Sequence, residues 1–429
     1  MKISKLNIEQ YKHLENLEFD FTYQTGKRKG QPLNKICFIG QSATGKTNLL
    51  ELINDSISDI ICKKVYVDTN HILNESLVKL KAEYEFIIDS KTVSYKNDIF
   101  NYNEEKFIRN SNRKFHHQDE IYNIIPKTNI PLYIKSNILS QNNIEIFTKN
   151  PLDLLEKYPI SESFSNNIKN ITPTLFDDKV KPDLWIFLLG EILDYRKKVT
   201  QKLSELFHKG LLSDNKDKLN SEFTKWQKDN PNKLEEFANK FNPIIKKLNL
   251  EIDLVNTEYS IPISNKNNDV IIPIQDTSTG TKSLLLTFLP LFKLDTKDTI
   301  VLMDEPERSL YPDMQMDLIE HYQNLAPDAQ FIVATHSPFI AASFEPEERF
   351  ILYFDDEGKV AVRRGSSPIG DDPNDMLKND FGVNYYNKHG EDAYKKYLSL
   401  KQAIAIEKDP VKKKELLLER VKLGDAYNF

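Results

Sequence analysis

Nine consecutive residues near the start of the chain have the types and spacing needed to bind phosphate. They fit the pattern G-x-x-x-x-G-K-[ST] plus one residue: Gly40, Gln41, Ser42, Ala43, Thr44, Gly45, Lys46, Thr47 and Asn48. The two glycines would let the backbone curl so that successive N–H groups point at phosphate oxygens. Lys46 would reach the β- and γ-phosphates of ATP, and the hydroxyl of Thr47 would hold Mg²⁺. We therefore predict a binding loop for ATP and Mg²⁺.

Two later apolar runs end in side chains that could hydrolyse a bound nucleotide. Residues 299–307 carry Asp304 and Glu305 at the end of the run. Asp304 would orient Mg²⁺ and its waters, and Glu305 is placed to polarise the attacking water. Residues 330–338 form a further run that ends with His336. Because ligands bind at the carboxyl ends of strands in open α/β sheets, His336 would reach the γ-phosphate or the attacking water.

The sequence around the phosphate loop supplies the strand and the helix that such a loop requires. Residues 36–39 form an apolar run that predicts a buried strand, and leucines and isoleucines follow the loop at helical spacing to about Ile61. The N-terminus of that helix adds positive potential beside the phosphates. The chain has only 13 glycines in 429 residues, below the usual share of about 7%, which argues against a chance match.

Residues 276–283, with the sequence Asp-Thr-Ser-Thr-Gly-Thr-Lys-Ser, allow two interpretations. A serine or threonine before an apolar run is what an ordinary helix N-cap looks like. The position of the stretch favours more than a cap, because Ser278 lies only 26 residues before Asp304. Its glycine, Gly280, is the only one between Gly210 and Gly358.

The patterning predicts an α/β fold organised in four parts. Residues 1–150 form an N-terminal lobe with the phosphate loop and flanking antiparallel strands, and residues 151–250 form a mostly helical insertion. Residues 251–370 return to strands and hold the signature, the Asp-Glu strand and His336. Residues 371–429 form a C-terminal helical extension.

Composition predicts a soluble cytoplasmic protein. The net charge is −6 and the pI about 5.9, so no global basic field points to nucleic acid. The most apolar short run, residues 184–189, is far too short to span a bilayer. Two cysteines, Cys37 and Cys62, indicate no disulfide framework and fit a reducing compartment.

The order of these motifs resembles the ABC-type ATPases of the SMC, RecF and overcoming-lysogenization-defect group. More narrowly, the chain resembles the stand-alone AAA family ATPases encoded in bacterial antiphage operons. The resemblance rests on three stretches and covers residues 1–60 and 270–345 well: Ser278-Thr279-Gly280-Thr281-Lys282, Asp304-Glu305-Pro306-Glu307 and Thr335-His336-Ser337-Pro338.

The resemblance implies a two-lobed head that dimerises head to tail around ATP, as a homodimer or within a higher homo-oligomer. Ser278 and Gly280 would then contact the γ-phosphate bound to Lys46 of the second copy. Residues 309–312 fall where the family has a dimer-facing loop, which often carries a histidine that this chain lacks. The family also implies a glutamine that senses Mg²⁺, for which Gln141 is the best candidate.

An aromatic or basic residue near the first strand commonly meets the adenine in this family. Tyr11, Lys12 and His13 are available, and the sequence does not choose among them. Overcoming-lysogenization-defect nucleases append a Toprim domain with acidic clusters on strands. The acids at 355–357 and 371–375 stand beside glycines and are interpreted as solvated turns.

The sequence thus predicts an ATPase that is the sensor or scaffold of a bacterial defence complex with a separate effector, a nuclease. ATP binding would close the dimer, and hydrolysis through Glu305 would reopen it. The leading alternative is a RecF-like DNA-maintenance ATPase that binds duplex DNA directly, with steep salt dependence. A small-molecule kinase would need neither a trans signature nor a water-activating acid. A transporter subunit fits the helical insertion less well, and an interaction protein with a dead site would lack the hydrolytic residues.

The C-terminal segment, residues 374–429, follows a complete ATPase core and is not needed to build the site. Its end predicts an amphipathic helix in which leucines and valines alternate with lysines. Two interpretations stay open: the segment packs back on its own chain, or it docks a second ATPase subunit or the effector through a helix.

Overall fold

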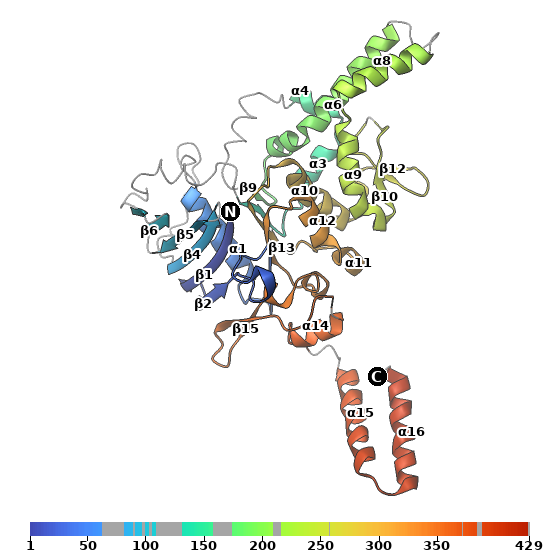
Figure 1. Ribbon diagram of the computed structural model, residues 1–429. Helices are drawn as coiled ribbons and strands as arrows, with labels where there is room; N and C mark the ends of the chain where they lie inside the picture. The colour runs from blue at the N-terminus through green and yellow to red at the C-terminus, as the bar shows by residue number, and fades with distance from the viewer. Residues whose placement is uncertain are drawn as a thin grey trace. The chain divides into compact units, whose positions relative to one another are not determined.

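The computed structural model describes residues 1–61, 81–88, 91–96, 99–102, 105–108, 131–157, 174–208, 216–256, 258–370, 372–383 and 388–427 (Figure 1). The chain divides into two compact units, Met1–Gly370 and Asp371–Phe429. Cys62 lies outside the described residues, as does part of the region 1–150 for which flanking antiparallel strands are predicted. In the part of the chain that is described, no helix is long and apolar enough to cross a membrane.

The larger sheet carries the phosphate loop and has seven strands in the order β16-β15-β3-β14-β13-β8-β9. All of its pairs are parallel except β15 with β16. Strands buried on both faces need continuous apolar sequence, which explains the runs that precede the candidate site residues. The strands are β3 (Lys35–Gly40), β8 (Leu132–Ile134), β9 (Thr174–Phe176), β13 (Ile300–Asp304), β14 (Gln330–Ala334), β15 (Arg349–Phe354) and β16 (Val360–Arg364).

A second sheet is antiparallel, in the order β2-β1-β4-β5-β6-β7. Alternation of buried and exposed residues along β2 follows the two-residue period of a strand with one face in the core. Phe19 of β2 packs its ring on Phe38 of β3 and Phe350 of β15, so the two sheets share one core. The strands are β1 (Lys2–Tyr11), β2 (Leu14–Asp20), β4 (Lys81–Ile88), β5 (Lys91–Lys96), β6 (Ile99–Tyr102) and β7 (Glu105–Ile108).

A helical layer builds the other half of the first unit. The rings of Phe237 and Phe241 from α9 pack against Phe288 and Phe292 of α10, and α6 and α12 also contact these helices. A small sheet joins it, with β10 (Leu250–Ile252), β11 (Ile263–Asn265) and β12 (Ile271–Ile272). The helices are α1 (Lys46–Ile61), α3 (Gln141–Glu145), α4 (Pro151–Lys157), α6 (Pro182–His208), α8 (Lys216–Asp229), α9 (Lys233–Ile245), α10 (Thr279–Lys293), α11 (Pro312–Gln315), α12 (Leu318–Leu325) and α13 (Pro338–Ala341).

Short 3₁₀ turns connect these elements: η1 (Gly26–Arg28), η3 (Ile146–Thr148), η4 (Lys246–Leu248), η5 (Ile274–Asp276) and η6 (Pro346–Glu348).

The mixed α/β fold with a flanking antiparallel sheet confirms the predicted fold class. The segment 151–250 is mostly helical, but it also contributes β9, which pairs with β8 at the edge of the seven-stranded sheet. A three-residue strand is too short to show a period in the sequence.

The second unit is helical and consists of α14 (Pro373–Asn379), α15 (Lys388–Ile406) and α16 (Pro410–Tyr427). Helices α15 and α16 lie side by side as a hairpin, seen at the C-terminal end of the chain in Figure 1. Lys396 pairs with Glu419 at 2.8 Å, and Arg420 donates to the hydroxyl of Tyr397 at 2.8 Å.

Candidate functional site

The phosphate loop lies between the end of β3 at Gly40 and the start of α1 at Lys46. The ammonium group of Lys46 is buried and donates to the carbonyl oxygens of Gly40 and Gln41, both at 3.0 Å. Burial lowers the pKa of Lys46 to about 8, although Glu305 and Asp304 act in the opposite direction. The loop therefore holds the Lys46 ammonium against its own carbonyl oxygens. The anionic oxygens of a nucleotide would be stronger hydrogen-bond acceptors for this ammonium.

The second glycine of the loop, Gly45, has a backbone φ of +94° and close neighbours. A Cβ at this position would lie 2.8 Å from a methyl of Leu14 and 2.9 Å from Nε2 of His13. Glycine is thus required for both conformation and space. It also follows that the imidazole of His13, in the turn between β1 and β2, lies directly against the loop.

The other two candidates for an adenine contact are held elsewhere. The ammonium group of Lys12 donates to Asn48 at 2.9 Å and pairs with Glu51 at 3.0 Å, both on α1. Tyr11 packs against the core, and the ammonium of Lys12 stands 5.2 Å from the centre of its ring. His13 alone of the three lies against Gly45.

Thr47 and Asp304 meet as the sequence predicts. The hydroxyl of Thr47 donates to both carboxylate oxygens of Asp304, each at 3.1 Å. Burial raises the pKa of Asp304 to about 6, and the nearby charge of Glu305 adds to this effect. A hydroxyl and a carboxylate side by side are hard oxygen ligands of the kind that Mg²⁺ prefers.

Glu305 and His336 also come together, at the ends of β13 and β14. Nε2 of His336 lies 3.8 Å from the Glu305 carboxylate, and their side chains are 43% and 37% exposed. Glu305 has a φ of +48°, unusual for a residue other than glycine, and its N–H donates to the carbonyl of Ala334 at 2.8 Å. Burial and the charge of Lys46 lower the pKa of His336. Both side chains can therefore reach solvent while the backbone holds them in place.

A buried polar chain fixes the strand ends and was not predicted. The Thr335 hydroxyl donates to Glu307 at 2.5 Å, and the N–H of His336 donates to the same carboxylate oxygen at 3.2 Å. The hydroxyl of Ser337 donates to the side-chain oxygen of Gln315 at 2.5 Å. The side-chain amide nitrogen of Gln315 in turn donates to the carbonyl of Leu310 at 2.7 Å. This chain ties the His336 loop to the turn after Glu305. Glu307 and Thr335 stand in the quoted motifs, but sequence spacing gave no reason to pair them.

Ser278 is the N-cap of α10, and its side chain accepts from the N–H of Thr281 at 3.1 Å. A Cβ on Gly280 would lie 2.6 Å from the carbonyl oxygen of Ser309. The start of α10 thus packs tightly on the turn that follows Asp304 and Glu305. In the described residues no hydrogen bond joins Ser278 to the phosphate loop of its own chain.

Gln141 does not enter the site in this structure. It is the first residue of α3, it is exposed, and within the described residues it makes no hydrogen bond to Thr47 or Asp304. Lys135 follows β8 directly, and Ile134 before it pairs with Met303 of β13. The ammonium of Lys135 pairs with one carboxylate oxygen of Glu51 at 3.0 Å, and the ammonium of Lys12 pairs with the other. No periodic pattern in the sequence pairs Lys135 with Glu51, which lie 84 positions apart.

ATP affinity in the absence of Mg²⁺ is expected to fall as the pH rises through about 8. Burial lowers the pKa of Lys46 from 10.5 to about 8 in the ligand-free loop. Above that pH the amine of Lys46 is mostly neutral in the ligand-free loop. Binding of the triphosphate then requires Lys46 to take up a proton. Affinity should then fall by up to about tenfold per pH unit. Calorimetry on both sides of pH 8 checks this. Lys46→Arg, which stays protonated, should show no such slope.

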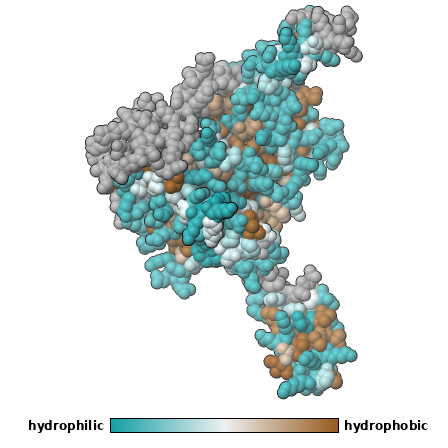
Figure 2. Space-filling model, in the orientation of Figure 1, coloured by the Kyte–Doolittle hydropathy of each residue, from teal (hydrophilic) through white to brown (hydrophobic). Residues whose placement is uncertain are grey.

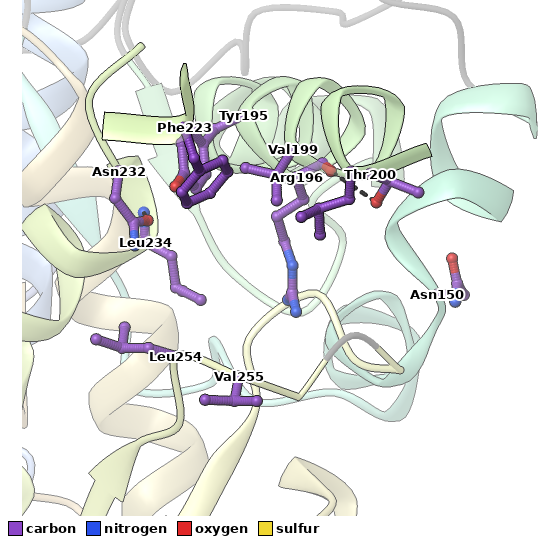
Figure 3. A pocket seen from close by; sticks show the side chains of 11 residues that line it. Asn150, Tyr195, Arg196, Val199, Thr200, Phe223, Asn232, Leu234, Leu254 and Val255 are labelled. Carbon is purple, nitrogen blue, oxygen red and sulfur yellow. Dashed lines mark hydrogen bonds between the residues drawn. The ribbon is translucent and has the colours of Figure 1, made fainter. Parts of the chain in front are cut away.

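A separate cavity of about 660 Å³ lies in the helical layer (Figure 3). Its walls come from α6, α8, α9 and the segment after β10, and they are mainly apolar. The guanidinium of Arg196 crosses its floor and donates to the carbonyl oxygen of Ser260 at 3.1 Å. The guanidinium also donates to the carbonyls of Asn256 and Tyr259, so its donors are directed at backbone oxygens.

The fold and these side chains define a phosphate-loop protein built to hydrolyse a nucleotide. The model of a family described as an AAA ATPase domain matches residues 1–341. The match covers most of the chain, and the protein belongs to this family of ATPases.

More distant similarity comes from one relative and from solved structures. The Retron Vc95 probable ATPase of Vibrio cholerae serotype O1 biovar El Tor is 32% identical over 78 residues, which are 18% of this chain and 15% of that protein. The match thus spans a small part of the relative. An SMC head bound to the C-winged helix domain of ScpA is 14% identical with a TM-score of 0.44, over 85% of this chain and 98% of that one. The SMC head domain from Thermotoga maritima is 12% identical with a TM-score of 0.40, over 85% and 100%.

Proposed function

We propose that the chain hydrolyses ATP at the carboxyl ends of β3, β14 and β13, the central strands of the seven-stranded sheet, with the side chains at and after these ends in the roles predicted above. One observation carries the proposal: the Thr47–Asp304 pair, the Glu305–His336 pair and the Lys46 ammonium are all at the carboxyl ends of three adjacent strands. A structural turn has no need for two acids, a buried lysine and a histidine in one place.

The roles follow from the contacts. Lys46 would exchange the carbonyls of Gly40 and Gln41 for phosphate oxygens, and the backbone N–H groups of residues 40–48 would surround the phosphates. Thr47 and Asp304 would hold Mg²⁺, which when bound supplies positive charge beside the β- and γ-phosphates. Asp304 must be ionised for this, and its pKa of about 6 leaves it ionised at neutral pH.

Glu305 would accept the proton of the attacking water as general base. Its partial exposure gives it access to water, and its backbone N–H bond to Ala334 holds it beside the site. His336, whose Nε2 lies 3.8 Å from the Glu305 carboxylate, would orient the water or the γ-phosphate. His13, held against Gly45, is the residue we assign to the adenine side of the loop.

The cellular role we propose is that of an ATPase subunit in a bacterial antiphage complex, acting as homodimer or higher homo-oligomer on a separate effector nuclease. The partial match to a retron ATPase supports this role. The resemblance of the motifs implies a head in which Ser278 would complete the site of a second copy. Exposure of Ser278 and Tyr311, the latter 75% exposed, leaves this face free for such contact.

Lys46→Ala is expected to abolish ATP binding and with it any protection against phage. The variant loses the side-chain charge that would meet the β- and γ-phosphates. The purified full chain should hydrolyse ATP with Mg²⁺ while the variant does not. A host carrying the gene with its native neighbouring genes should resist phage, and the variant should not. Steeply salt-dependent duplex DNA binding by the chain alone, without any protection, would favour DNA maintenance instead.

A further inference from the structure

Helix α16 carries two apolar stripes on opposite faces, and only one of them meets α15. Leu416 and Leu423 lie on the partly covered face, beside Arg420, which contacts Tyr397 of α15. The opposite face is uncovered: Val411 is 68% exposed, and Leu417, Leu418 and Val421 are 41%, 53% and 56% exposed. No residue of α16 is buried. Figure 2 shows apolar side chains gathered on this hairpin.

The spacing of the uncovered stripe is that of a helix seam. Val411, Leu418 and Val421 are separated by seven and three residues, the spacing at which side chains meet a partner helix. Lys414 and Asp425 occupy the remaining two seam positions. Within the described residues, neither side chain makes a hydrogen bond or an ion pair. Exposed apolar residues in such a row are typical of a contact surface.

Charge indicates which partner fits this face. Residues 371–429 carry 11 acidic and 11 basic side chains, so the whole net charge of −6 belongs to residues 1–370. A neutral segment is not adapted to a strongly charged partner such as nucleic acid. In addition, Lys414 and Asp425 stand near opposite ends of the seam and carry opposite charges. A second copy of the same stripe, running antiparallel, would set each of these charges opposite its complement.

We infer that α16 pairs antiparallel with α16 of a second copy of this chain, independently of nucleotide. In this two-fold arrangement Leu418 packs on Val421 of the second copy, and Val421 on its Leu418. The same register sets Lys414 opposite Asp425 at both ends of the seam. Two hairpins joined in this way form a four-helix bundle, which buries the stripe that one hairpin leaves in water.

The test uses the full chain carrying Lys46→Ala, without nucleotide, so that the proposed ATP-dependent head dimer cannot contribute. Sedimentation equilibrium should show a dimer. Leu418→Glu should give a monomer with unchanged helical content, since the residue is on the surface. Lys414→Asp and Asp425→Lys should each raise the dimer Kd by about tenfold or more, and the two together should restore it.

Lys413→Asp is the matched control, because it makes the same charge change one residue away and off the seam. It should leave the dimer Kd within about twofold of the parent. A parent protein that stays monomeric at high micromolar concentration overturns the inference and leaves the stripe to a different partner. A dimer that ignores Leu418→Glu, or a double charge swap that fails to restore association, overturns it as well. Loss of ATPase activity in the Lys46 background has no bearing on these readouts.

Discussion

Glu305→Gln is expected to bind ATP as tightly as the native chain and to hydrolyse it about 10²- to 10⁴-fold more slowly, the usual contribution of a general base. The amide keeps the size of the side chain but cannot accept a proton from water. The backbone that presents it, held by the N–H bond to Ala334, does not depend on the carboxylate. Single-turnover hydrolysis and equilibrium nucleotide binding measure the two quantities separately.

Two comparisons make this result specific to Glu305. His336→Gln removes a group 3.8 Å away and should cost less than Glu305→Gln if histidine orients rather than accepts the proton. Glu307→Gln alters a carboxylate that bonds Thr335 and the N–H of His336, so it should lower the melting temperature along with activity. Hydrolysis by Glu305→Gln at the native rate would mean that another group is the base.

Ser278→Arg is expected to leave ATP binding intact and to abolish multiple-turnover hydrolysis. If Ser278 completes the site of the second copy, a long cationic side chain there prevents closure of the dimer without touching the phosphate loop of its own chain. Mixing Ser278→Arg with Lys46→Ala protein should restore at most one working site in each mixed dimer, because one native loop then faces one native signature. The readout is ATPase rate against mixing ratio.

The N-cap role of Ser278 requires a separate control. Its hydroxyl accepts from the N–H of Thr281, and loss of a cap costs about 1 kcal/mol. Ser278→Asn keeps a capping oxygen and should match the native melting temperature. A loss of ATPase activity in this variant would then come from the proposed contact with the second copy and not from loss of the helix cap. Normal turnover by a Ser278→Arg homodimer would contradict the trans arrangement and revive the kinase interpretation.

Sequence alone determined the elements that carry the chemistry. Glycine-lysine-threonine after a four-residue apolar run is enough to place a loop between β3 and α1, because strand and helix periods differ and glycine marks the change. Buried parallel strands must be apolar throughout, so a carboxylate directly after one marks its end. For the same reason Asp304, Glu305 and His336 could be assigned to strand ends without coordinates.

Tertiary structure alone decided which side chains meet. The strand order puts β14 between β3 and β13, and this order, set by long-range pairing, brings Glu305 to His336 and Thr47 to Asp304. Side-chain contacts between distant segments leave no periodic signal, so Lys135 on Glu51 and His13 on Gly45 were invisible in the sequence. Gln141 was suggested by the family resemblance as the Mg²⁺ sensor; it begins α3, six residues after Lys135, and within the described residues it makes no hydrogen bond to Thr47 or Asp304, so that role stays a prediction.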